Sequence, residues 1–262
     1  MAPELPLTPG RRLALAIGAP VVLALIGYTG FYYVALVGQD SYRIQPRTAP
    51  AGAALSAAIG SGDVTVGPSP DRRAHLSGVV NYSLFRPSLT WRTTSTGVVL
   101  SGPGCFWIGN CGAEITLAVP FGESVKASSG SGNLKVTGIG GALNLSDGSG
   151  NITGEHLSGA LVLNDSSGDI NVTDIGSARV RAYAGSGNVD ISFSRPPDDL
   201  TASASSGNIT VAVPARVAYD VIADASSGTE QVDVPTDPSS HRVIHLDAGS
   251  GNIRVVPALP AR

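Results

Sequence analysis

The 262-residue sequence is short of charge, cysteine and aromatic side chains. Only 14% of its residues are charged, and its net charge of -3 argues against a nucleic-acid-binding protein. Two cysteines are too few for a disulfide framework, although they are enough for one local bridge. With 42% hydrophobic residues the chain is too apolar to be disordered, and its 33 Gly and 18 Pro argue against long helices or coiled coils.

One long uncharged stretch runs from Leu13 to Val37. As a helix it would extend about 37 Å, against a hydrocarbon core of about 30 Å, so it predicts a transmembrane helix. The alternative is a cleaved signal peptide, whose apolar region would be only about 7 to 15 residues long. The candidate cleavage sites around Ala35 and Val37 also lack a small residue at both key positions. We therefore expect an uncleaved single-pass anchor, preceded by a short cytoplasmic tail over residues 1–12.

The residues that flank the anchor predict its orientation. Arg11 and Arg12 lie directly against the apolar run, whereas Asp40 separates the other end of the run from Arg43. Basic residues beside a span favour the cytoplasm, so we expect the amino terminus inside the cell and the carboxyl-terminal domain outside. Residues 38–56 contain two prolines and little periodicity, which predicts a juxtamembrane linker.

Beyond this linker a short motif recurs, consisting of a small residue, Gly, a turn-forming polar residue and then alternating apolar residues. Seven copies and a degenerate eighth, at Ser227-Gly228-Thr229, occur in the chain. From Gly132 to Gly251 the successive glycines are 18, 18, 19, 20, 21 and 23 residues apart, which indicates a structural repeat. The predicted turn positions are Gly62, Gly132, Asn133, Gly150, Asn151, Gly168, Asp169, Gly187, Asn188, Gly207, Asn208, Gly251 and Asn252.

Between these turns the apolar residues alternate with period two, as in Leu134 and Val136 or Leu143 and Leu145, which predicts β-strands. Each repeat supplies two short strands that are too small to be stable alone. The sequence therefore predicts a mainly β protein, a β-solenoid of the β-helix or β-roll kind with coils of about 18–23 residues. This domain should span residues 57–256 and leave 257–262 as a tail. We expect the turn glycines to have positive φ and the Asn side chains to form a hydrogen-bonded ladder along the stack.

The Ser-Gly-Asn and Ser-Gly-Asp units, their alternating Leu, Ile and Val, and the single preceding anchor resemble the bacterial candidate-adhesin family called domain of unknown function 4097. The resemblance covers about residues 57–256 and is strongest from residue 126 onward. It implies a β-strand-repeat solenoid on the outer face of a bacterial membrane. It carries over no catalytic residues, because the shared pattern marks turns and core positions.

Residues 82–121 depart from the repeat and contain most of the unusual side chains. Cys105 and Cys111 would form a disulfide on the oxidising side of a membrane. The aromatic residues Phe85, Trp91, Phe106 and Trp107 suggest a binding surface for a sugar or a protein. The alternative, which we favour, is an end cap that shields the first coil.

Other candidate chemistries have weaker support. His241 and His245 belong to a strand-like segment that would hold them about 13 Å apart, too far to share a metal, so we expect no metal site and no cofactor. Asp147, Asp165, Asp169 and Asp174 are reminiscent of carboxylates in polysaccharide-cleaving β-helices, but each occupies a turn position where Asp is common. Taken together, these features predict a non-enzymatic binding or structural module of the bacterial envelope. We expect it to be adhesive in character, with a glycan or protein ligand and no nucleic-acid partner. The alternatives are a regulatory or envelope-stress scaffold that binds another membrane protein and, less favoured, a carbohydrate-active enzyme.

Overall fold

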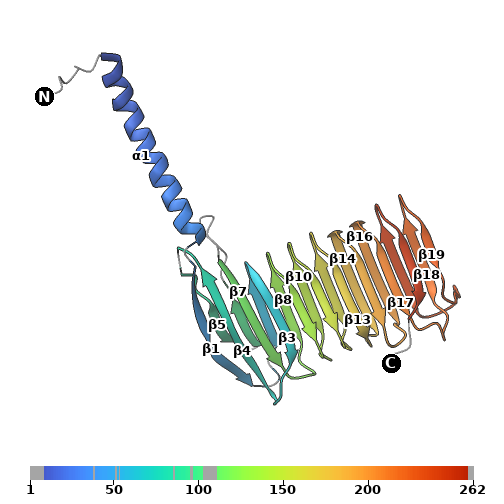
Figure 1. The fold of residues 1–262 in the computed structure, drawn as a ribbon. Coiled ribbons are helices and arrows are strands. Elements are labelled where there is room, and N and C mark those ends of the chain that lie inside the picture. Colours follow the sequence, from blue (N-terminus) through green and yellow to red (C-terminus); the bar gives the residue numbers. More distant parts are fainter. Residues whose placement is uncertain are drawn as a thin grey trace.

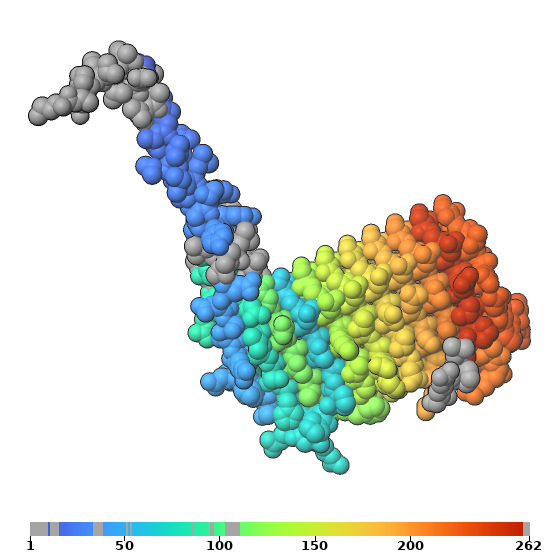
Figure 2. Space-filling view, viewed as in Figure 1, coloured from blue at the N-terminus to red at the C-terminus, as the bar shows by residue number. Residues whose placement is uncertain are grey.

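The computed structural model describes residues 9–37, 39–50, 52, 54–84, 86–94, 97–102 and 111–258. One helix, α1 (Pro9–Val37), leads into a domain built of two β-sheets (Figure 1). The helix begins earlier than the predicted span and stands clear of the β domain (Figure 2). Its segment Ala16–Tyr33 is long and apolar enough to cross a membrane, a composition that a signal sequence near the amino terminus shares.

The two sheets are called sheet A and sheet B. Sheet A contains, in spatial order, β1 (Asp40–Pro50), β4 (Arg73–Tyr82), β7 (Cys111–Val119), β3 (Gly62–Pro68), β9 (Leu134–Thr137), β11 (Ile152–Glu155), β13 (Ile170–Ile175), β15 (Val189–Phe193), β17 (Ile209–Val213), β21 (Ile253–Pro257) and β19 (Glu230–Val232). Sheet B contains β18 (Asp220–Ala225), β20 (Val243–Ala248), β16 (Asp199–Ser206), β14 (Arg179–Ser186), β12 (Leu161–Asp165), β10 (Leu143–Asp147), β8 (Val125–Ser129), β2 (Ala54–Ile59), β6 (Gly97–Ser101) and β5 (Thr90–Thr94). The chain is therefore mainly β, as predicted.

Each repeat places one strand in each sheet, parallel to the equivalent strand of its spatial neighbour. Leu143 pairs with Leu161 in sheet B, and Ile152 pairs with Ile170 in sheet A. Side chains alternate between buried and exposed along these strands, because successive residues of a strand point to opposite faces. The predicted inward residues, such as Leu145 at 0% exposure, fill the space between the sheets and form one continuous core.

The ladder expected from the repeated Asn is present at one edge of the stack. The backbone N–H of Asn151 donates to Oδ1 of Asn133 at 3.2 Å, and that of Asp169 donates to Oδ1 of Asn151 at 3.0 Å. The same bond continues to Asn188, then Asn208 and then Asn252. We call this side of the domain the ladder edge. Its bonds run from strand to strand and hold the repeats in register.

The glycines of the motif satisfy two different requirements. Gly62 and Gly132 have φ of 136° and 138°, where a residue with a Cβ is strained, as the sequence suggested. Gly150 lies outside this range of φ and needs space instead. A Cβ on Gly150 would lie 1.8 Å from the carbonyl oxygen of Gly132 in the neighbouring turn. Close approach of stacked backbones therefore explains a glycine that positive φ does not.

The stacking order differs from the chain order at both ends, which corrects the expectation of repeats stacked in sequence. β20 and β21, the last strands in the chain, insert between the preceding repeat and the strands β18 and β19, which form the outer end. The end repeat carries the degenerate motif, in which Thr229 donates to Oδ1 of Asn252. An end repeat has only one neighbour, so it needs no Asn to continue the ladder. At the other end β2 and β3 likewise lie inside β6 and β7.

The predicted linker over residues 38–56 is also corrected. Residues 40–50 form β1, an edge strand that pairs antiparallel with β4, and β2 already begins at Ala54. The prolines that suggested a linker are compatible with this position. Pro46 falls where the register shifts between Ile44 and Arg47, and proline is tolerated at edge strands and bulges because it lacks the N–H for a ladder bond.

Candidate functional site

The register of sheet A places the end of α1 beside the ladder edge. Asp40, at the start of β1, pairs with Tyr82, which in turn pairs with Cys111 at the start of β7. β7 runs parallel to β3, so these residues lie at the same edge as Gly62, the first turn glycine. Apart from β5, which is antiparallel to β6, the strands of sheet B run toward this edge. Their first residues lie at the opposite edge, which we call the distal edge.

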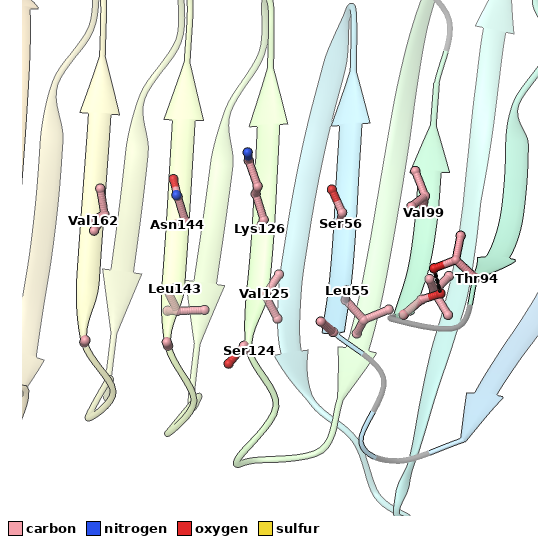
Figure 3. A pocket seen from close by; sticks show the side chains of 15 residues that line it. Leu55, Ser56, Thr94, Val99, Ser124, Val125, Lys126, Leu143, Asn144 and Val162 are labelled. Atoms are coloured by element: carbon pink, nitrogen blue, oxygen red, sulfur yellow. Dashed lines mark hydrogen bonds between the residues drawn. The ribbon is translucent and has the colours of Figure 1, made fainter.

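A groove of about 540 Å³ lies on sheet B near the distal edge. Figure 3 shows Ser56, Lys126, Asn144 and Val162 projecting from successive strands along it. Thr94 closes one end, where its Oγ1 donates to the carbonyl oxygen of Gly97 at 2.8 Å. The lining residues are Ala54, Leu55, Ser56, Thr94, Gly97, Val98, Val99, Ser124, Val125, Lys126, Ala142, Leu143, Asn144, Ala160 and Val162.

The groove arises from a row of small residues at the strand starts. Ala54 pairs with Gly97. The carbonyl groups of Ser124, Ala142 and Ala160 accept hydrogen bonds from the backbone N–H groups of Leu55 in β2, Val125 in β8 and Leu143 in β10. Because these side chains are small, the surface is hollowed between the distal turns and the larger side chains of the next outward row. A small residue at the start of β2 and directly before β8, β10 and β12 is visible in the sequence, but the groove was not predicted from it.

The groove is mainly apolar, with one basic side chain. Val99 is 38% exposed, and Ala142 and Ala160 are exposed as well. Lys126 supplies the only charge among the lining residues, and Asn144 and Ser56 supply neutral polar groups. Such a surface suits an extended ligand with small apolar groups and an acidic group opposite Lys126.

Of the four predicted binding aromatics, only Trp91 lies within the described residues. It is partly buried and packs against the core, which is the behaviour of a cap residue. Phe85, Phe106 and Trp107 lie outside the described residues, as does Cys105, so the aromatic surface and the disulfide with Cys111 stay predictions. Nearby, the Arg86 guanidinium lies 4.3 Å from the centre of the Tyr42 ring. The Tyr42 hydroxyl donates to the carbonyl oxygen of Pro87 at 2.7 Å.

The four aspartates considered as candidate acids are not gathered into one site. Asp169 belongs to the exposed ladder, and Asp174 is ion-paired with His156 at 3.0 Å. Asp147 and Asp165 are buried, at 2% and 1% exposure, although each still accepts the backbone N–H two residues on, as an Asp at a turn does. They continue the inward alternation of β10 and β12 by one more position.

The histidines behave as the strand pattern predicted. His245 is exposed on β20, between the buried Ile244 and Leu246. His241 lies before the strand begins. Within the described ranges, no cluster of three or more His, Cys, Asp or Glu side chains is arranged to hold a metal ion.

Solved structures with similar folds include several from bacteria. A candidate adhesin from Parabacteroides merdae is 12% identical with a TM-score of 0.49, over 84% of this chain and 97% of that one. A candidate adhesin from Bacteroides fragilis is 17% identical with a TM-score of 0.47, over 82% and 97%. A candidate cell adhesion protein from Clostridium sporogenes is 15% identical with a TM-score of 0.41, over 83% and 100%. These likenesses carry no inference about function.

Comparison with the curated proteins gave no match. The family model described as Toastrack DUF4097 matches residues 114–256, more than half of the chain, and covers the regular repeats of both sheets. The chain therefore belongs to the Toastrack DUF4097 family.

Proposed function

We propose that the chain is a single-pass membrane protein of the bacterial envelope whose β domain, a β-solenoid outside the cell, binds a protein ligand without catalysing a reaction. The observation that carries this proposal is the position of the groove. It opens at the distal edge, across the domain from the edge where α1 enters. With α1 in the membrane, the groove is the part of sheet B that faces outward.

The connection between helix and domain supports this arrangement. Only Gly38 and Gln39 separate α1 from β1, a reach of about 10 Å at most. The ladder edge must then lie close to the bilayer surface. The apolar run of α1, the basic Arg11 and Arg12 and the length of the span support an uncleaved anchor with its amino terminus in the cytoplasm over a cleaved signal peptide.

The chemistry of the groove favours a protein over a glycan. It crosses five neighbouring strands, about 19 Å at the usual strand spacing, which matches an extended peptide of about six residues. Among the described residues, its lining contains aliphatic side chains and no aromatic ring on which a sugar could stack. Lys126 is placed to meet a carboxylate of the ligand.

Site-specific photo-crosslinking in intact cells tests the proposal. A crosslinkable residue at Asn144, inside the groove, should give a covalent adduct that protease digests. The matched control is the same residue at Ala58, which is exposed on the same face of sheet B but lies outside the groove. Adducts at neither position, or equally at both, would refute the groove as the binding site. An adduct that only a glycosidase digests would replace the protein ligand by a glycan.

A second candidate function is a regulatory scaffold that binds another membrane protein through α1. The short connection between α1 and β1 favours this function, because a change in the domain on ligand binding would be transmitted directly to the helix. Crosslinking from Phe31 or Tyr33, both exposed on α1, should then trap a membrane protein. A crosslink from Asn144 in the groove without a crosslink from α1 would support the binding module and argue against the regulatory scaffold.

A further inference from the structure

A column of inward-facing residues runs through the domain beside the ladder edge. It is formed by the last inward position of successive sheet B strands, and the strand register joins each member to the next. In spatial order it contains Ile59, Ser129, Asp147, Asp165, Ala184, Ala204, Ala248 and Ala225. Six members are apolar or small, whereas Asp147 and Asp165 are neighbouring acids in the middle of the stack.

Only one oxygen of each of the two carboxyl groups accepts a hydrogen bond from the described residues. Oδ1 of Asp147 accepts the backbone N–H of Ser149 at 3.3 Å, and Oδ1 of Asp165 accepts that of Ser167 at 3.0 Å. Oδ2 of each is buried and has no hydrogen-bond donor among the described residues. Two buried carboxylates on adjacent strands, about 4.8 Å apart, would repel each other across the core.

Ser129, the member of the column next to Asp147, forms a hydrogen bond to the turn of the neighbouring repeat. The Ser129 hydroxyl donates to the carbonyl oxygen of Gly62, in the turn of the neighbouring repeat, at 3.0 Å. One repeat along, the ideal Cβ position on Gly150 lies 2.8 Å from Oδ2 of Asp147 and 1.8 Å from the carbonyl oxygen of Gly132. The two oxygens therefore lie within about 5 Å of each other, and a carboxylate in this position would face a second acceptor.

Asp165 repeats this geometry. The ideal Cβ position on Gly168 lies 3.0 Å from Oδ2 of Asp165 and 1.5 Å from the carbonyl oxygen of Gly150. A neutral carboxylic acid, unlike a carboxylate, has an O–H that can donate to such a carbonyl, as the Ser129 hydroxyl does. The glycine carbonyls of the turns thus favour a proton on the acids beside them.

The charged groups that act on the pair are themselves acidic. Asp63 acts on Asp147, and Asp147 and Asp169 act on Asp165. The other neighbours in the column, Ser129 on β8 and Ala184 on β14, carry no charge. Burial is the main cause that raises the pKa of both carboxyl groups, that of Asp165 to about 6.

We propose that Asp147 and Asp165 form a proton-binding site, in which a neutral acid donates to a glycine carbonyl of the neighbouring turn and locks the middle of the β domain. Because folding raises the pKa of these groups above the ordinary 3.8, the folded chain holds a proton that the unfolded chain releases. The stabilisation is complete below the ordinary pKa of about 4 and is lost as the pH rises through about 6. The site would make the stability of β10 and β12, which also carry Asn144 and Val162 of the groove, depend on external acidity.

Infrared spectroscopy and thermal unfolding of the full-length chain in detergent micelles test this site. Carboxyl groups of ordinary pKa lose their proton at about pH 4, so the diagnostic signal is the carbonyl stretch of a neutral carboxylic acid that persists above this range. This late-fading band should disappear only as the pH rises through about 6. The unfolding temperature should fall over the same range. In the double variant Asp147→Asn with Asp165→Asn, both the band and this fall should be lost, because an amide donates at every pH and carries no charge. The control Asp247→Asn alters an exposed acid on the outer face of β20, away from the pair, and should keep both.

Three results would overturn the proposal. The first is persistence of the late-fading band in the double variant, which would assign it to another acid. The second is an unchanged pH dependence of the unfolding temperature in that variant. The third is stabilisation by added Ca²⁺ at constant pH that the double variant abolishes, which would make the ligand a metal ion. If the double variant does not fold, the absence of the late-fading band from the parent protein between about pH 5 and 6 overturns the proposal on its own.

Discussion

Oδ1 of Asn188 accepts the backbone N–H of Asn208 at 3.0 Å, although the two residues are twenty positions apart in the chain. The side-chain amide of Asn208 also donates to this oxygen, at 3.2 Å. Each complete repeat offers one such acceptor, so a strand that slipped by one residue would lose its bond to the next turn. The ladder therefore fixes the register of the stack at the edge where α1 enters.

Removal of a rung should lower stability by a predictable amount. Asn188→Ala leaves the N–H of Asn208 without its acceptor, and we expect a loss of about 1 kcal/mol in the free energy of unfolding. Asn188→Asp keeps the acceptor but replaces the amide that donates to Oδ1 of Asp169 at 3.2 Å by a second carboxylate, so it should recover little of this loss. Asn171→Ala, at an exposed position on the outer face of β13, is the matched control and should have little effect. Thermal unfolding of the full-length variants measures all three, and equal losses at 188 and 171 would contradict the role of the ladder.

Close stacking of the turns predicts that one glycine is irreplaceable and another is not. A Cβ on Gly207 would lie 1.9 Å from the carbonyl oxygen of Gly187, so Gly207→Ala should cost about 3 kcal/mol. A Cβ on Gly112 meets no atom within 4 Å, and Gly112→Ala should be tolerated. Unfolding temperatures decide this comparison. A tolerated Gly207→Ala would show that the turns can separate without loss.

The inward and outward assignment of β13 can be tested at two adjacent residues. Ile170 is fully buried, and Ile170→Asp places an unpaired charge in the core, at a cost of about 4 kcal/mol or loss of folding. Asn171→Asp is exposed on the other face and should change the unfolding temperature little. Loss of β structure by circular dichroism in the first variant alone is the expected outcome.

The repeat itself could be predicted from the sequence because its signals are local. A glycine every 18 to 23 residues and apolar residues in alternation define turns and inward positions wherever they occur, as at Leu134, Val136, Leu143 and Leu145. The same alternation extends to Asp147 and Asp165, whose residue type indicated a turn position but not their burial. The pattern was the better guide, since burial of these acids follows from their place in the strand.

Other features could not be predicted because they depend on which strands become neighbours. Nothing local to Ile253 indicates that it pairs with both Ile209 and Glu230 rather than following the chain order. The edge strand β1 could not be recognised because Pro46 and Pro50 resemble linker residues. Pro46 falls in the register shift of β1, and Pro50 pairs with Arg73 of β4. The groove exists only because small residues of five separate strands become adjacent.

The disulfide predicted between Cys105 and Cys111 can be tested by alkylation. Under non-reducing conditions neither thiol should react with an alkylating reagent, and mass spectrometry should show both blocked only after reduction. A bond that closes a loop of about seven residues should stabilise the fold by about 2 to 3 kcal/mol. Cys111→Ser should then lower the unfolding temperature as much as reduction does. Two reactive thiols in the protein isolated from cells would contradict the bond.

The orientation of the chain gives the last prediction. If α1 is an uncleaved anchor and the β domain lies outside, protease added to intact spheroplasts should digest the domain and leave a small membrane fragment that contains Ala16–Tyr33. The fragment follows from the short connection, because the bilayer shields the helix while the distal turns remain accessible. A cytoplasmic protein should survive in the same sample and show that the membrane is intact. Protection of the full-length chain would place the domain inside the cell, and a soluble chain beginning near Gly38 would show that α1 is a cleaved signal peptide.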